Sequence, residues 1–128
     1  MASLPTDKFR VVVLISADAE WQAVKEILEA ASRQPGTSED WFSTRMGDET
    51  VLFFRGGWGK VAASSSTQQV IDLFHPEILV NLGTCGGLEG RIEKGTILLV
   101  NRTIIYDIIE QMSDPNEVLA YYSTGLDY

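Results

Sequence analysis

Two short apolar runs, residues 10–16 and 78–82, constrain the fold of this chain more than any other feature of its sequence. Neither run alternates polar with apolar residues, and each leads directly into a turn of small residues. A strand with one solvated face alternates, whereas a strand buried on both faces does not. The two runs therefore predict a parallel sheet that is covered by helices.

Helical and hairpin patterns fill the interval between these strands. Residues 21–32 and 59–74 have apolar residues at helical spacing, and Pro76 ends the second helix. The runs 41–46 and 49–55 are joined by a Gly-Asp pair, which predicts a hairpin. This order predicts an α/β fold with a mixed, mainly parallel sheet flanked by helices.

The end of the chain has a weaker pattern. A last strand is expected at residues 96–100, with a continuation toward Tyr106, and residues 113–116 form an expected turn. A length of 128 residues fits one compact domain, so a single domain over residues 1–128 is expected.

Three turns of small residues follow predicted strands, at residues 16–18, 56–59 and 83–87. The carboxyl ends of parallel strands meet at one edge of a sheet, and ligands bind there in open α/β folds. The three turns are therefore expected to form the rim of a ligand site.

Composition excludes several kinds of function and partner. A formal net charge of −8 repels a phosphate backbone, so no nucleic-acid partner is expected. The only cysteine, Cys85, forms no internal disulfide and fits a reducing compartment. The chain shows no membrane-helix run and no signal-peptide pattern, and no cluster with metal-ligand spacing, so a cytoplasmic protein without membrane contact or metal is expected.

Two of the three turns of small residues, those at 56–59 and 83–87, carry motifs of a known family. Residues 57–63 resemble the G-x-G-K-V-A-A segment of methylthioadenosine/S-adenosylhomocysteine nucleosidases, and residues 81–87 are similar to their N-x-G-[ST]-x-G-G turn. Residues 94–97 match the K-x-G-D-[IV] step of that family approximately. The resemblance covers most of residues 10–107 and implies the N-terminal half of a phosphorylase/hydrolase-like fold of the nucleoside phosphorylase/nucleosidase superfamily.

The resemblance implies that Glu20 is the catalytic acidic residue of the first loop and helix, acting through its carboxylate. In hydrolysis of an N-ribosidic bond, a carboxylate orients and deprotonates the water that attacks the anomeric carbon. The structural alternative is an acid that favours the helix N-terminus because of the helix macrodipole.

The resemblance also implies that Thr84, Cys85 and Gly86, with Gly57, line the site of the purine and ribose. The alternative is a plain turn in which glycine supplies unusual backbone conformations. Cys85 is not expected to be a nucleophile, because the only histidine, His75, lies at a predicted helix end away from any triad pattern.

One position favours water over phosphate as the nucleophile. Similar phosphorylases carry an arginine that holds the phosphate where this chain has Asn81, and residues 16–20 lack the glycine and arginine that assist it. The implied function is hydrolysis of the N-glycosidic bond of a purine nucleoside such as methylthioadenosine, in nucleoside catabolism or salvage, without a cofactor.

The chain departs from the family in its length. The longer family members supply a Met-Glu segment for the ribose hydroxyls and an Asp that protonates the purine, and none of Asp107, Asp114 or Asp127 matches that Asp. The alternative function is therefore a truncated, catalytically incomplete nucleoside-binding or interaction protein, and a third is a generic α/β domain. An incomplete sheet exposes edges and apolar surface, so a homodimer, common in the family, is expected.

Overall fold

The computed structural model describes residues 8–28, 40–107, 114, 116–117 and 123–125. The chain divides into two compact units, one up to Cys85 and the other from Gly86 onward. The expectation of one domain over the whole chain stays a prediction.

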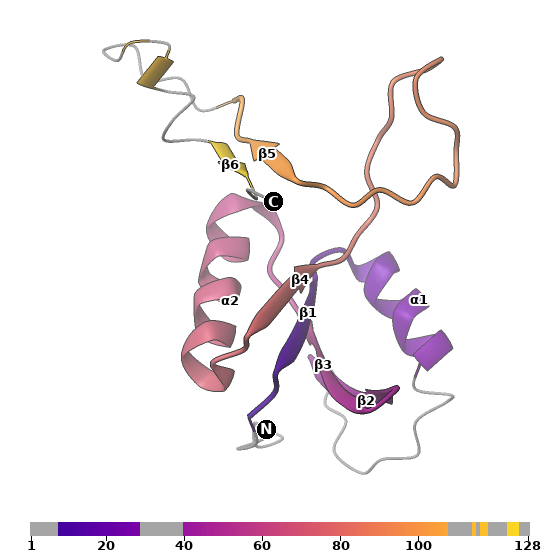
Figure 1. Ribbon diagram of the computed structural model, residues 1–128, viewed down its shortest axis with the longest axis vertical. Helices are drawn as coiled ribbons and strands as arrows, with labels where there is room; N and C mark the ends of the chain where they lie inside the picture. Colours follow the sequence, from indigo (N-terminus) through magenta and orange to yellow (C-terminus); the bar gives the residue numbers. More distant parts are fainter. Residues whose placement is uncertain (1–7, 29–39, 108–113, 115, 118–122, 126–128) are drawn as a thin grey trace. The chain divides into compact units, whose positions relative to one another are not determined.

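The first unit contains a four-stranded sheet and two helices (Figure 1). The strand order is β2-β3-β1-β4, in which β1 is parallel to β3 and β4 whereas β2 is antiparallel to β3. The predicted mixed, mainly parallel sheet is therefore confirmed, and its hairpin bounds match the prediction. In chain order the elements are β1 (Val11–Ile15), α1 (Asp18–Leu28), β2 (Trp41–Met46), β3 (Glu49–Arg55), α2 (Gly59–Phe74) and β4 (Ile78–Asn81).

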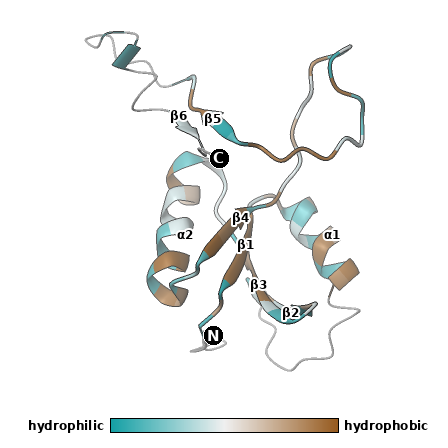
Figure 2. Ribbon diagram, viewed as in Figure 1, coloured by the Kyte–Doolittle hydropathy of each residue, from teal (hydrophilic) through white to brown (hydrophobic). Residues whose placement is uncertain are grey.

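The two helices cover opposite faces of the sheet, and the core has two corresponding halves (Figure 1). Val70 and Phe74 of α2 pack on one face, together with Val12 and Leu14 of β1. Trp21 of α1 packs on the other face, where Val13, Ile15 and Phe53 are also buried. Because β1 is buried on both faces, it needs apolar residues throughout, and Figure 2 shows it in the hydrophobic colour.

A column of three aromatic rings attaches α1 to the sheet. Trp21 lies 5.4 Å from Phe42, centroid to centroid, and Phe42 stacks on Phe53 at 4.9 Å across the β2–β3 pair. Trp21 is 1% exposed and belongs to the first two turns of the helix. Aromatic pairs of this kind add to the free energy of burial, so the column fixes the start of α1 against the sheet.

The end of α2 follows the predicted stop signal. His75 adopts the left-handed conformation with φ of 46°, and its backbone N–H donates to the Ile71 carbonyl at 3.0 Å. The prediction that His75 ends a helix is confirmed. The predicted continuation of α1 from Leu28 to residue 32 lies outside the described residues.

The second unit contains a two-stranded antiparallel sheet, β5 (Arg102–Ile104) with β6 (Ser123–Gly125). The strand predicted at residues 96–100 is wrong: the structure shows no strand there, and Ile97 is 96% exposed. A strand requires a partner for its backbone hydrogen bonds, and the strand pairing described in this unit begins only at Arg102. Among the described residues, no helix is long and apolar enough to cross a membrane.

Candidate functional site

The carboxyl ends of β1, β3 and β4 lie side by side in the first unit. Ile15 is in register with Arg55 of β3, and Leu14 is in register with Asn81 of β4. The turns that follow begin on the same strand end, because Gly56 N–H donates to the Ile15 carbonyl at 2.7 Å and Leu82 N–H donates to the Leu14 carbonyl at 2.9 Å. The expected gathering of the turns at one sheet edge is therefore seen for residues up to Cys85.

The two connections that leave this edge diverge. The chain after β1 passes to α1 on one face, whereas the chain after β3 passes to α2 on the other face (Figure 1). In open α/β sheets, ligands bind outside the carboxyl ends of strands where successive connections diverge in this way. The side chains at the end of β1 therefore lie where a ligand is expected.

Glu20, in the first turn of α1, is joined to Thr84, which lies just beyond β4. Thr84 donates twice to the same oxygen, Glu20 Oε1: its backbone N–H at 2.6 Å and its hydroxyl Oγ1 at 2.5 Å. The residues are 64 positions apart in sequence, so the contact depends on the adjacency of β1 and β4. Glu20 is half-buried and Thr84 is exposed, which leaves the pair at the surface of the sheet edge.

These hydrogen bonds hold the Glu20 carboxyl in its ionised form. The Thr84 hydroxyl is the largest cause of a pKa below the ordinary value, followed by the Thr84 backbone N–H, while the Ala17 backbone N–H contributes less. Burial acts in the opposite direction but is weaker than the two Thr84 bonds. Glu20 is therefore an anion at neutral pH, suited to accept a proton or to orient a water rather than to donate a proton.

The other three predicted site residues have different surroundings. Gly57 donates its backbone N–H to Ser66 Oγ at 3.1 Å, and a Cβ on Gly57 would stand 2.5 Å from the Cβ of Ala62. This glycine is thus required for close packing of the turn on α2. Cys85 is exposed with a free thiol, and Gly86, where the second unit begins, has open space around its Cβ position.

Arg55, at the end of β3, connects this strand to the first turn of α1. Its guanidinium donates to Asp18 Oδ1 at 2.5 Å and lies 3.9 Å from a carboxylate oxygen of Asp40. Among the described arginines of the first unit, Arg55 is the one at the carboxyl edge, and these two carboxylates already neutralise it.

The sequence analysis missed two residues of this edge, Arg55 and Gly83. A signal for Arg55 was available, since a charged residue directly ends the apolar run of β3 before a glycine turn. Gly83 was treated only as part of a motif, although its position directly before Thr84 places it beside the Glu20 carboxylate.

Comparison with known proteins identifies the family. Residues 10–127 match the Phosphorylase superfamily. Since this match covers nearly the whole sequence, the chain belongs to that superfamily.

The similar proteins have more specific names. The chain is 28% identical over 99 residues to a protein of Marinomonas sp. (strain MWYL1) named 5'-methylthioadenosine/S-adenosylhomocysteine nucleosidase, covering 77% of this chain and 43% of that protein. A protein of the same name from Staphylococcus epidermidis is 35% identical over 63 residues, which are 49% of this chain and 28% of that one. The chain thus spans less than half the length of the relatives it matches, and no solved structure matches it significantly.

Proposed function

We propose that this chain hydrolyses the N-glycosidic bond of a purine nucleoside such as methylthioadenosine, with Glu20 activating the water. The observation that carries the proposal is the double hydrogen bond from Thr84 to the Glu20 carboxylate. It joins two residues that the family resemblance had separately assigned to the site. The names of the relatives supply the substrate class.

The proposed chemistry uses Glu20 as the acceptor for water. The carboxylate orients a water toward the anomeric carbon, the C–N bond breaks with its electron pair leaving on the purine, and positive charge develops on the ribose. The water oxygen then bonds to that carbon and its proton passes to Glu20. The low pKa of Glu20 keeps it anionic until the attack makes the water acidic, and Thr84 fixes the carboxylate for that step.

Two features favour water over phosphate as the nucleophile. Asn81 stands where similar phosphorylases carry an arginine, and an amide offers no charge to a phosphate dianion. The guanidinium of Arg55 is already engaged by Asp18 and Asp40. A phosphate that used Arg55 would have to displace both carboxylates.

Thr84, Cys85, Gly86 and Gly57 are proposed to line the site of the purine and ribose. Thr84 already uses its N–H and hydroxyl hydrogen on Glu20, so its hydroxyl oxygen is the atom left to accept from a ribose hydroxyl. The proposed physiological role is nucleoside catabolism or salvage.

The test is chromatographic detection of free base after the chain is incubated with purine nucleosides, with and without phosphate. Phosphate-independent release of adenine supports the hydrolase. Release only with phosphate indicates a phosphorylase, and nucleoside binding without release indicates the binding-only alternative. Either of the last two outcomes contradicts the proposal.

A matched pair of variants assigns the activity to the site. Glu20→Gln should reduce base release by about 100-fold to 10,000-fold, the usual contribution of a general base. Glu26→Gln makes the same chemical change at an exposed position of the same helix and should leave release unchanged. Equal activity of the two variants would remove Glu20 from the mechanism.

A homodimer and a cytoplasmic location remain predictions. Light scattering of the purified chain tests the first, with a mass of twice 14.2 kDa expected. A monomer at micromolar concentration would contradict it.

A further inference from the structure

Gly83 lies between the end of β4 and Thr84, and its missing side chain faces the Glu20 carboxylate. A Cβ on Gly83 would stand 3.1 Å from Glu20 Oε2, 3.4 Å from Oε1 and 3.5 Å from the carboxyl carbon. All three nearest atoms therefore belong to one functional group. The distance of 3.1 Å to Glu20 Oε2 is shorter than the normal contact between a carbon and an oxygen that share no hydrogen bond.

The backbone at Gly83 does not itself require glycine. Positive φ angles occur at Gly47, Gly59, Gly90 and Gly95, but not at Gly83. An alanine could thus adopt the same backbone conformation, and the usual explanation of a turn glycine does not apply here. The steric reason for glycine at this position is the carboxylate.

We propose that Gly83 is a positioning residue, whose lack of a side chain lets the Glu20 carboxylate reach both donors of Thr84. Glu20 Oε1 approaches the Thr84 backbone N–H at 2.6 Å, so the carboxylate lies almost against the main chain of the turn. A methyl group on Gly83 pushes the carboxylate off that surface. The carboxylate is the far end of a flexible side chain, so it moves at little cost to the fold but loses its hydrogen bonds.

A positioning role and a purely structural role of Gly83 have different consequences. If Gly83 served only the fold, Gly83→Ala would lower stability and leave the titration of Glu20 unchanged. A positioning role predicts instead that the pKa of Glu20 rises toward its ordinary value, and that stability falls only by what the lost hydrogen bonds to Thr84 contribute. The inference rests on the proposed function only where it concerns turnover.

The experiment is a carbon-detected NMR titration of the Glu20 carboxyl, assigned by its disappearance in Glu20→Gln. Gly83→Ala should raise the pKa of Glu20, whereas Gly86→Ala should leave that pKa unchanged because a Cβ there meets nothing within 4 Å. A Glu20 that titrates in folded Gly83→Ala as in the wild type overturns the proposal, whatever the activity.

A second variant covers the case in which Gly83→Ala does not fold. Because the nearest atoms all belong to Glu20, the additional change Glu20→Ala removes the clash and should restore folding. Failure of the double variant to fold overturns the proposal.

Turnover provides a separate measurement. If the wild type releases base, Gly83→Ala should reduce kcat by roughly 100-fold with little change in KM, as expected for a reacting group misplaced by about 1 Å. An unchanged kcat overturns the positioning role in catalysis. If neither the wild type nor the variant releases base, the proposed function fails, while the titration of Glu20 still decides the role of Gly83.

Discussion

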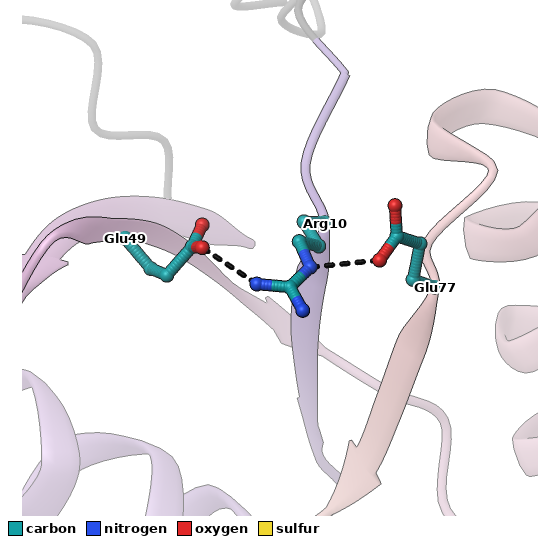
Figure 3. Close-up of polar contacts among 3 residues, drawn as sticks. All are labelled: Arg10, Glu49 and Glu77. Atoms are coloured by element: carbon teal, nitrogen blue, oxygen red, sulfur yellow. Dashed lines mark hydrogen bonds and ion pairs between the residues drawn. The ribbon is translucent and has the colours of Figure 1, made fainter.

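Arg10, at the amino end of β1, β3 and β4, and Glu20, at the carboxyl end of these strands, are held in opposite ways. At the amino end, the Arg10 guanidinium lies between two carboxylates, at 2.7 Å from Glu49 and 2.7 Å from Glu77 (Figure 3). At the carboxyl end, the Glu20 carboxylate is held by the hydroxyl and the backbone N–H of Thr84, both of them neutral.

The difference shows which of the two charges can act on a bound substrate. Arg10, directly before β1, connects this strand to Glu49 at the start of β3 and to Glu77 directly before β4, and its charge is neutralised by the two carboxylates. Glu20 is also held by two contacts, but both donors belong to Thr84 and are neutral, so they leave its negative charge uncompensated. A fixed and uncompensated charge is what a reaction with a developing cation requires. Arg10 therefore has the features of a structural contact and Glu20 those of a reactive group.

The largest expected effect comes from removing the anchor of the carboxyl end. Trp21→Ala empties a buried site against Phe42 and should lower the free energy of unfolding by about 3–5 kcal/mol, the usual cost of such a truncation. Chemical denaturation measures this loss. Trp58→Ala is the matched control, because Trp58 is 78% exposed and its truncation should change stability little. Similar losses in both variants would show that Trp21 does not anchor α1.

The strands of the first unit could be predicted from the sequence because their signals are local. The unbroken apolar run of β1 and the Gly-Asp pair between β2 and β3 each depend on neighbouring residues, and both predictions match the structure. The run at residues 96–100 looks equally like a strand, but strand formation depends on a partner elsewhere in the chain, which sequence spacing does not reveal.

The candidate site was predictable in its residues but not in its contacts. Glu20 and Thr84 came from the family resemblance, while the hydrogen bond between them depends on the order of β1 and β4 in the sheet. Arg55 contacts Asp18, and Gly83 lies beside the Glu20 carboxylate, although the partners are far apart in sequence. Such distances follow from the three-dimensional fold and have no pattern along the chain.

A smaller effect is expected when the neutral donor is removed from Glu20. Thr84→Val deletes the hydroxyl that contributes most to the low pKa of Glu20, and keeps the backbone N–H. The pKa of Glu20 should rise, and the free energy of unfolding near neutral pH should fall by about 1 kcal/mol, as for one hydrogen bond.

The pH dependence of Thr84→Val follows from the sign of this shift. A carboxyl whose pKa is lowered in the folded state adds stability above its ordinary pKa of 4.5, and this stability is lost as the pH falls through the folded value. The difference between Thr84→Val and wild type should therefore be full at pH 7 and shrink in acid. Denaturant titrations at several pH values measure it, and a difference that persists unchanged in acid would show that the hydroxyl acts otherwise than on the charged carboxylate.

The smallest effect is expected at the amino end. Arg10→Met removes the guanidinium charge and keeps most of the side-chain length, so it breaks both ion pairs. Because Arg10 and its partners are largely exposed, water and salt already screen these pairs, and the melting temperature should fall only slightly. Thermal unfolding at low and high salt measures the fall, which should shrink as salt increases. The titration of Glu20 in this variant should match that of the wild type, because Arg10 lies at the opposite end of β1. A shifted pKa of Glu20 in this variant would mean that Arg10 and Glu20 are coupled. A loss of stability as large as that of Trp21→Ala would mean that Arg10 is more than an exposed ion-pair contact.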